Sequence, residues 1–280
     1  SVSNLSCLYG NDKGYPCMIV EQTRIIVATT GDRPTLLFAC LNSLYKLMPE
    51  YKVVVVAQET PDIVKKNLLT LQKIRKEWGL EFVWHDKKSG PHSAKVSVLE
   101  KYPDTELWVS MDDDMEVIKE TNYKTALEKA LESKVGIISC NWVRTESLIA
   151  KRDNKDKFVS QKLIYTGGGF VFSKKIAKLV LQLPNRPYSF DDCLWAGVAY
   201  SEGYTNYRYL GSLCIHRVCS KGGRQSFLMK AESALPPDGY VIMTPCKKQM
   251  YPYKTANYYM PKPNEVHPDA EANHIRNKKG

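Results

Sequence analysis

Four consecutive valines, Val53 to Val56, form an apolar run with no polar alternation. Successive side chains of a strand point to opposite faces of its sheet, so an entirely apolar strand needs cover on both faces. Helices packed on both sides of a parallel sheet provide such cover. The run therefore favours an α/β fold.

Strand and helix patterns alternate around this run. Short β-branched runs predict strands, and apolar residues repeating at intervals of three and four predict helices. The predicted strands are 25–28, 53–56, 81–84, 106–111, 135–140 and 170–172. The predicted helices cover about 37–48, 61–78, 93–101, 122–133, 174–183 and 191–201. This order predicts a doubly wound, mostly parallel, Rossmann-like sheet with helices on both faces.

The length of 280 residues suits one large domain with an extension. We expect an irregular lead-in over 1–22, a main α/β domain over 23–225 and a basic, irregular extension rich in Pro, Tyr and Lys over 226–280. The eight cysteines form no Cys-x-x-Cys pair, and we expect most of them to be reduced. The sequence assigns no oligomeric state.

No apolar run approaches the roughly 18 residues of a membrane span, which favours a cytoplasmic protein without a transmembrane segment. Because the chain begins at Ser1, a luminal ectodomain whose anchor has been removed is the alternative. The formal net charge is +10, with basic residues concentrated in 144–162, 217–224 and 247–280. Such a surplus favours a polyanionic partner, and simple solubility is the alternative explanation.

Three consecutive carboxylates, Asp112, Asp113 and Asp114, follow the predicted strand 106–111. Packed side by side, such charges repel and resist desolvation, so a core does not select them. At the carboxyl end of a parallel strand they lie where open α/β sheets bind ligands. There they can hold a hard divalent cation, which in turn can bind a diphosphate. A solvated acidic turn is the alternative.

Other motifs stand around the triplet in a fixed order. A Thr-Gly-Asp-Arg-Pro turn follows the first strand, Gly167 to Gly169 precede a later one, Asp191 and Asp192 open a helix, and His216 comes last. This order resembles that of glycosyltransferases with the GT-A fold, over roughly residues 23–221. In the resemblance, the triplet matches the Asp-x-Asp motif of the family, and Asp191-Asp192 takes the place of its Glu-Asp base motif.

The resemblance implies a divalent cation, Mn²⁺ or Mg²⁺, that neutralises the diphosphate leaving group. It places Asp114 on the metal, Asp112 on the nucleotide or the metal with Asp113 able to exchange roles, and His216 as a further metal ligand. The general base of an inverting reaction is Asp192, with Asp191 the second candidate because it departs from the Glu of the family. Capping of the helix is the alternative role for this pair.

Donor-binding candidates end the other strands. The switch-point rule puts strand ends around a nucleotide, which selects Thr29, Thr30, Arg33, Gln58 and Lys95, the last as a phosphate contact. By resemblance, Gly168 and Gly169 lie under the donor sugar. Lys221 and Arg224 lie in a Gly-containing segment that can close over a diphosphate.

The sequence is thus interpreted as a metal-dependent, inverting glycosyltransferase with a nucleotide-sugar donor, for which a UDP-sugar is the favoured choice. Glycan, protein and DNA acceptors all stay open. The basic surplus, together with Tyr251, Tyr253, Tyr258 and Tyr259 for base stacking, favours DNA carrying hydroxymethylated bases, to which some glycosyltransferases add sugars. A nucleotidyltransferase is one alternative, although residues 29–33 make a poor phosphate loop. A non-catalytic nucleic-acid-binding protein is another, and it leaves the acidic triplet unexplained.

Overall fold

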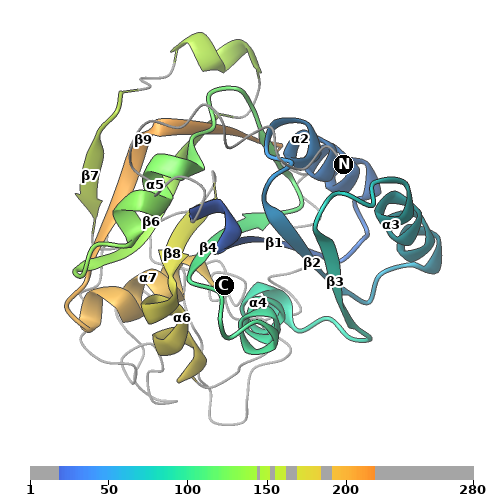
Figure 1. Ribbon diagram of the computed structural model, residues 1–280, viewed down its shortest axis with the longest axis horizontal. Helices are drawn as coiled ribbons and strands as arrows, with labels where there is room; N and C mark the ends of the chain where they lie inside the picture. Colours follow the sequence, from blue (N-terminus) through green and yellow to red (C-terminus); the bar gives the residue numbers. More distant parts are fainter. Residues whose placement is uncertain (1–18, 144–145, 152–154, 162–168, 184–190, 218–280) are drawn as a thin grey trace, which may run out of the picture.

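The computed structural model describes residues 19–143, 146–151, 155–161, 169–183 and 191–217, and these form one sheet with helices on both faces (Figure 1). The strands are β1 (Thr23–Thr29), β2 (Lys52–Gln58), β3 (Leu80–His85), β4 (Leu107–Asp112), β5 (Met115–Val117), β6 (Val135–Val143), β7 (Phe158–Gln161), β8 (Phe170–Ser173) and β9 (Thr205–His216). The helices are α2 (Pro34–Leu47), α3 (Asp62–Ile74), α4 (Gly90–Lys101), α5 (Tyr123–Ala130), α6 (Lys174–Leu181), α7 (Asp192–Ser201) and the short 3₁₀ helix η1 (Glu146–Lys151).

The strand order is β3-β2-β1-β4-β8-β6-β9-β5, with β7 paired to β9. β1 to β4 are mutually parallel, and β6 and β9 run in the same direction as these four. β8, β5 and β7 pair antiparallel to their neighbours. The predicted α/β class with a mostly parallel sheet is therefore confirmed.

Strand alternation divides the core into two layers. Odd-numbered residues of β1 and β2, such as Ile25 and Val55, pack with α2, α3 and α5, whereas even-numbered ones such as Ile26 and Val54 pack with α4, α6 and α7. All of these residues are fully buried, which explains the uninterrupted valine run. Figure 1 shows these two sets of helices on opposite sides of the sheet.

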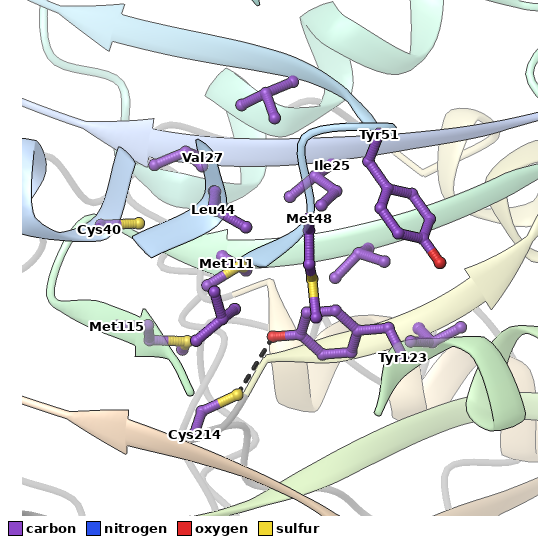
Figure 2. Packing of buried hydrophobic residues seen from close by; sticks show 14 of the residues in the cluster. Ile25, Val27, Cys40, Leu44, Met48, Tyr51, Met111, Met115, Tyr123 and Cys214 are labelled. Atoms are coloured by element: carbon purple, nitrogen blue, oxygen red, sulfur yellow. Dashed lines mark hydrogen bonds between the residues drawn. The ribbon is translucent and has the colours of Figure 1, made fainter. Parts of the chain in front are cut away.

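Three buried cysteines in the described ranges, Cys40, Cys140 and Cys214, are free thiols, in agreement with the expected reduced state. Cys214 Sγ lies 3.3 Å from the hydroxyl of Tyr123, within the layer drawn in Figure 2. Burial raises the pKa of the Cys214 thiol to about 11, so it packs as a small apolar group rather than a nucleophile.

The second half of the sheet departs from the sequence prediction. No predicted element covers residues 205–216, yet they form β9, a 12-residue strand that pairs with β5, β6 and β7. Its buried positions do not alternate regularly, and its register against β6 shifts twice, so period-two analysis fails there. β5 and β7 are too short and too polar to give a signal.

Residues 19–21, at the end of the predicted lead-in, are helical, and Ile19 packs in the core. Residues 1–18 and the predicted extension 226–280 lie outside the described residues. Searching the described ranges reveals no helix of the length and apolarity that a membrane span requires.

Candidate active site

The acidic triplet occupies the tight connection between β4 and β5. Asp112 is the last residue of β4, and Asp113 and Asp114 form the turn that follows. The strand order reverses here, because β2 and β3 lie on one side of β1 and β4 lies on the other. Such a switch point at the carboxyl ends of parallel strands is where open α/β sheets bind ligands. The triplet is thus located where the sequence predicted.

Asp112 faces the layer formed by α4, α6 and α7. It lies four residues after Trp108, so strand alternation puts both on the same face of β4. Lys95 of α4 donates hydrogen bonds from Nζ to Asp112 Oδ1 (3.1 Å) and to Asp191 Oδ2 (2.6 Å). Burial opposes the charged form of Lys95, but the two carboxylates outweigh it and raise its pKa above the ordinary value. One ammonium thus joins the end of β4 to the start of α7.

Asp113 is fully buried and points to the end of β1. Thr29 Oγ1 donates a hydrogen bond of 2.6 Å to Asp113 Oδ2, and the Arg33 guanidinium pairs with Oδ1. Burial raises the pKa of Asp113 to about 7, although Arg33 and Thr29 work against this shift. In this arrangement the carboxylate anchors the acidic turn to β1 and is not exposed to a ligand.

Asp114 pairs on one side with Arg33 and on the other with His216. Arg33 Nη1 lies 2.8 Å from Asp114 Oδ2, and His216 Nε2 lies 3.2 Å from Asp114 Oδ1. Burial favours the neutral acid, but His216 and Arg33 prevail and lower the pKa of Asp114. The ladder between β5 and β9 places His216 opposite Met115, and Arg217 N donates to Asp114 O at 2.7 Å. Backbone pairing therefore fixes this contact.

The Asp114–His216 pair has the donor set of a metal site. Within the described residues, His216 Nδ1 is buried without a hydrogen-bond partner, and Asp114 Oδ1 has the His216 imidazole as its neighbour. Their ring-to-carboxylate separation, 3.2 Å from Nε2 to Oδ1, is close to the spacing of adjacent ligands in an octahedral shell, about 3.0 Å for bonds of about 2.1 Å. An oxygen and an imidazole nitrogen suit Mn²⁺. These two residues fit a divalent cation.

Asp112 is not part of that pair. In the described ranges no group of three or more His, Cys, Asp or Glu side chains is arranged to hold a metal ion. Strand alternation explains the separation, because Asp112 is directed to α4 and α7 while Asp114, beyond the strand end, meets β9. Mg²⁺ and related ions often take only one or two protein carboxylates and complete their shell with water and substrate phosphates. A two-residue protein site is therefore chemically sufficient.

The predicted donor-binding residues at β1 and β2 mostly support the loops. Thr29 Oγ1 also accepts a hydrogen bond from Gly31 N (2.9 Å), and Thr30 Oγ1 bonds to Asp32. Gln58 is buried, and its Oε1 accepts hydrogen bonds from the backbone N (2.7 Å) and the hydroxyl of Ser89. Gln58 therefore ties the end of β2 to the turn before α4, on the rim of the switch point.

Position 169 requires a glycine because of its backbone conformation and because neighbouring atoms leave little room for a side chain. Its φ is +80°, and an added Cβ would meet the Tyr123 hydroxyl at 3.0 Å and the Ser110 carbonyl oxygen of β4 at 3.2 Å. Its carbonyl accepts a hydrogen bond from Cys140 N. The predicted residues Gly168, Lys221 and Arg224 lie outside the described residues.

Of the two base candidates, Asp191 points into the site and Asp192 is the first residue of α7. Asp191 stands at the N-cap position without a side-chain capping hydrogen bond, and its carboxylate is taken up by Lys95 instead. The sequence analysis missed Trp142, whose ring meets the edge of the His216 ring at 5.5 Å. No local sequence pattern predicts this contact, because it depends on the pairing of β6 with β9.

No protein-family model and no curated protein sequence matches this chain. Several solved structures match it in fold. A mannosyltransferase, PcManGT from Pyrobaculum calidifontis, in complex with GDP-Man and Mn²⁺, aligns with a TM-score of 0.57 and 17% identity over 75% of this chain and 61% of its own. GalNAc-T7 with UDP, GalNAc and Mn²⁺ aligns with a TM-score of 0.59 and 11% identity, over 71% of this chain and 44% of its own.

TarS 1-349 of S. aureus, in complex with UDP-GlcNAc, aligns with a TM-score of 0.54 and 16% identity over 76% of this chain and 65% of its own. The chain thus spans less than two thirds of the length of each of these three proteins. At such identities the alignments establish the fold. The chain shares the GT-A fold of these three structures.

Proposed function

We propose that this protein is a metal-dependent glycosyltransferase that moves a sugar from a nucleoside diphosphate to a hydroxyl acceptor. The observation that carries the proposal is the Asp114–His216 pair at the switch point, in which a largely buried carboxylate oxygen and an imidazole nitrogen lie 3.2 Å apart. An oxygen and a nitrogen ligand at this separation are the groups that a divalent cation takes. The fold, and the Mn²⁺ present in two of the similar structures, support the same conclusion.

Asp114 and His216 would hold the cation. When bound, Mn²⁺ or Mg²⁺ supplies positive charge to the two phosphates of the leaving nucleotide. The Arg33 guanidinium pairs with the carboxylates of Asp113 and Asp114, and the Arg33 side chain is 29% exposed. A guanidinium in this position can donate to a phosphate oxygen in a bidentate manner, which makes Arg33 the best donor contact among the predicted residues.

The general base would come from the pair Asp191-Asp192. An inverting transfer requires a carboxylate that accepts the proton of the attacking hydroxyl. The sequence analysis gives Asp192 first and Asp191 second. We favour Asp191, because its carboxylate and that of Asp112 accept hydrogen bonds from the same Lys95 ammonium, which links the start of α7 to the acidic turn.

A panel of sugar nucleotides tests the proposal. UDP-glucose, UDP-GlcNAc, UDP-GalNAc and GDP-mannose would be incubated with Mn²⁺ and no acceptor, and release of the nucleoside diphosphate would be measured. We expect a UDP-sugar to be hydrolysed slowly, and EDTA to stop the release. A thermal shift with donor and Mn²⁺ together, exceeding that of either alone, would accompany it. A nucleotidyltransferase would release pyrophosphate from a nucleoside triphosphate instead, and a nucleic-acid-binding module would release nothing.

The DNA acceptor remains a proposal that rests on charge. The basic residues that motivated it lie in 144–162, 217–224 and the extension 226–280, and of these the described ranges include only Lys151, Lys155, Lys157 and Arg217. Arg217 itself pairs with Glu116 and Glu146. Duplex DNA binding across a salt series is the first test, and contact with about six phosphates predicts a log–log slope near −5. Transfer to an oligosaccharide in preference to DNA carrying 5-hydroxymethylpyrimidines would assign the acceptor to the glycan class.

A further inference from the structure

Lys95 occupies a position that the sequence did not predict. As a phosphate contact it would need an accessible ammonium, but its side chain is only 2% exposed. Its Nζ instead lies between two carboxylates that are 79 residues apart in sequence, Asp112 of β4 and Asp191 before α7. A buried ion is costly unless it is paired and hydrogen-bonded, so this arrangement depends on both partners being present.

The surroundings of Lys95 are buried and closely packed. One turn earlier on α4, His92 Nδ1 accepts a hydrogen bond of 2.9 Å from Trp195 Nε1 of α7. Trp195 is fully buried and packs edge-on against Phe170 and Phe172 of β8. Two hydrogen bonds, His92–Trp195 and Lys95–Asp191, therefore join α4 to the start of α7, one helical turn apart on α4. A movement of the start of α7 relative to α4 would disturb both hydrogen bonds.

The two carboxylates differ in a way that matters for chemistry. The Asp191 side chain is 10% exposed and bonded to Lys95, whereas the Asp112 side chain is 44% exposed at the strand end. Lys95 thus connects a largely buried carboxylate at the start of α7 to an accessible one at the end of β4. A displacement of about 1 Å at a reacting group can lower a rate by about 10²-fold.

We infer that Lys95 is a positioning residue for the transfer reaction, which holds the Asp191 carboxylate in fixed register with Asp112 and thereby aligns the base with the donor. This role rests on the proposed glycosyltransferase function. Lys95 touches neither substrate in this assignment, and it acts through Asp191.

A double-mutant cycle tests the role. Lys95→Met, Asp191→Asn and the double variant would be compared with the wild-type chain in two measurements: denaturant unfolding, and kcat and KM for the best sugar nucleotide of the panel with Mn²⁺. Lys95→Met should lower kcat by about 10²-fold, with a much smaller change in donor KM. The double variant should be no slower than Asp191→Asn, because Lys95 acts through Asp191.

Lys174→Met is the matched control. Lys174 Nζ pairs with Glu106 at 2.8 Å, next to the opposite end of β4, so its loss removes a lysine–carboxylate pair far from the triplet. Its kcat should stay within about twofold of wild type. If Lys95→Met fails to fold, the double variant, which has no buried unpaired carboxylate at 191, still reports whether Lys95 adds anything beyond Asp191.

The outcomes are distinct. Coupling between Lys95 and Asp191 in both kcat and unfolding free energy supports the positioning role. Independent, multiplying losses in kcat, or wild-type kcat for Lys95→Met, overturn it while leaving the glycosyltransferase function intact. A wild-type chain that turns over no sugar nucleotide overturns the proposed function and the positioning role together, even where the unfolding cycle shows the contact.

Discussion

The two outer carboxylates of the acidic turn have opposite surroundings although a single residue separates them. Asp112 faces the helical layer of α4 and α7 and shares a lysine with Asp191, whereas Asp114 meets Arg33 and the imidazole of His216 on β9. On the first side both carboxylates accept hydrogen bonds from one lysine. On the second side the carboxylate lies between a guanidinium and an imidazole, and the imidazole is a group that can also bind a metal ion. If the proposed function is correct, one short motif serves two purposes, positioning on one face and ligand binding on the other.

The largest expected effect is that of replacing Asp114. We expect Asp114→Ala to abolish transfer and metal-dependent donor binding while the fold survives, because the proposed cation loses its only carboxylate in the pair. Turnover and Mn²⁺-dependent thermal shift measure the effect, and circular dichroism monitors the fold. Full activity of this variant, or undiminished wild-type activity in EDTA, would contradict the metal assignment.

On the other side, Asp191→Asn should leave donor binding nearly intact and lower turnover by about 10²-fold or more, as loss of a general base does. Donor affinity by calorimetry and turnover would be measured on the same preparations. Asp192→Asn is the matched comparison, because it changes the adjacent carboxylate by the same atoms. If Asp192→Asn alone slows the reaction, the base is the residue that the sequence favoured.

His216→Ala sharpens the metal side with a smaller effect. We expect the apparent affinity for Mn²⁺ to fall at least about tenfold, with activity recovered at high Mn²⁺, because Asp114 and the diphosphate still bind the ion. A titration of activity against Mn²⁺ measures the shift. An unchanged midpoint would remove His216 from the set of metal ligands.

The smallest expected effect is on stability, at a glycine that supports the whole acidic turn. Gly169 lies against Ser110 of β4, behind the acidic turn, and Gly169→Ala should lower the free energy of unfolding by about 1–3 kcal/mol. Gly203→Ala is a matched control, since Gly203 has the same φ of +80° but nothing within 4 Å of the added Cβ. Denaturant unfolding should show a larger loss at 169 than at 203. Equal losses would mean that only the backbone conformation matters.

The sequence was most informative in the first half of the sheet. Apolar runs such as Val53–Val56 and the helices between them follow from local periodicity, and residues 23–112 form the predicted strands and helices with small shifts at their ends. The second half was less predictable. β9 owes its place to pairing with β5, β6 and β7, and its irregular pattern carries little local information.

By itself, the sequence determined the α/β class and the position of three carboxylates at the end of a buried strand, because hydrophobic period and strand length are local properties. Only the tertiary structure decided which groups each carboxylate meets. The packing of α4 and β9 on the sheet brings Lys95 and His216 within 3.2 Å of the triplet, and Asp191, at the start of α7, is joined to it through Lys95. Such long-range contacts depend on strand order and helix packing, which no local pattern encodes.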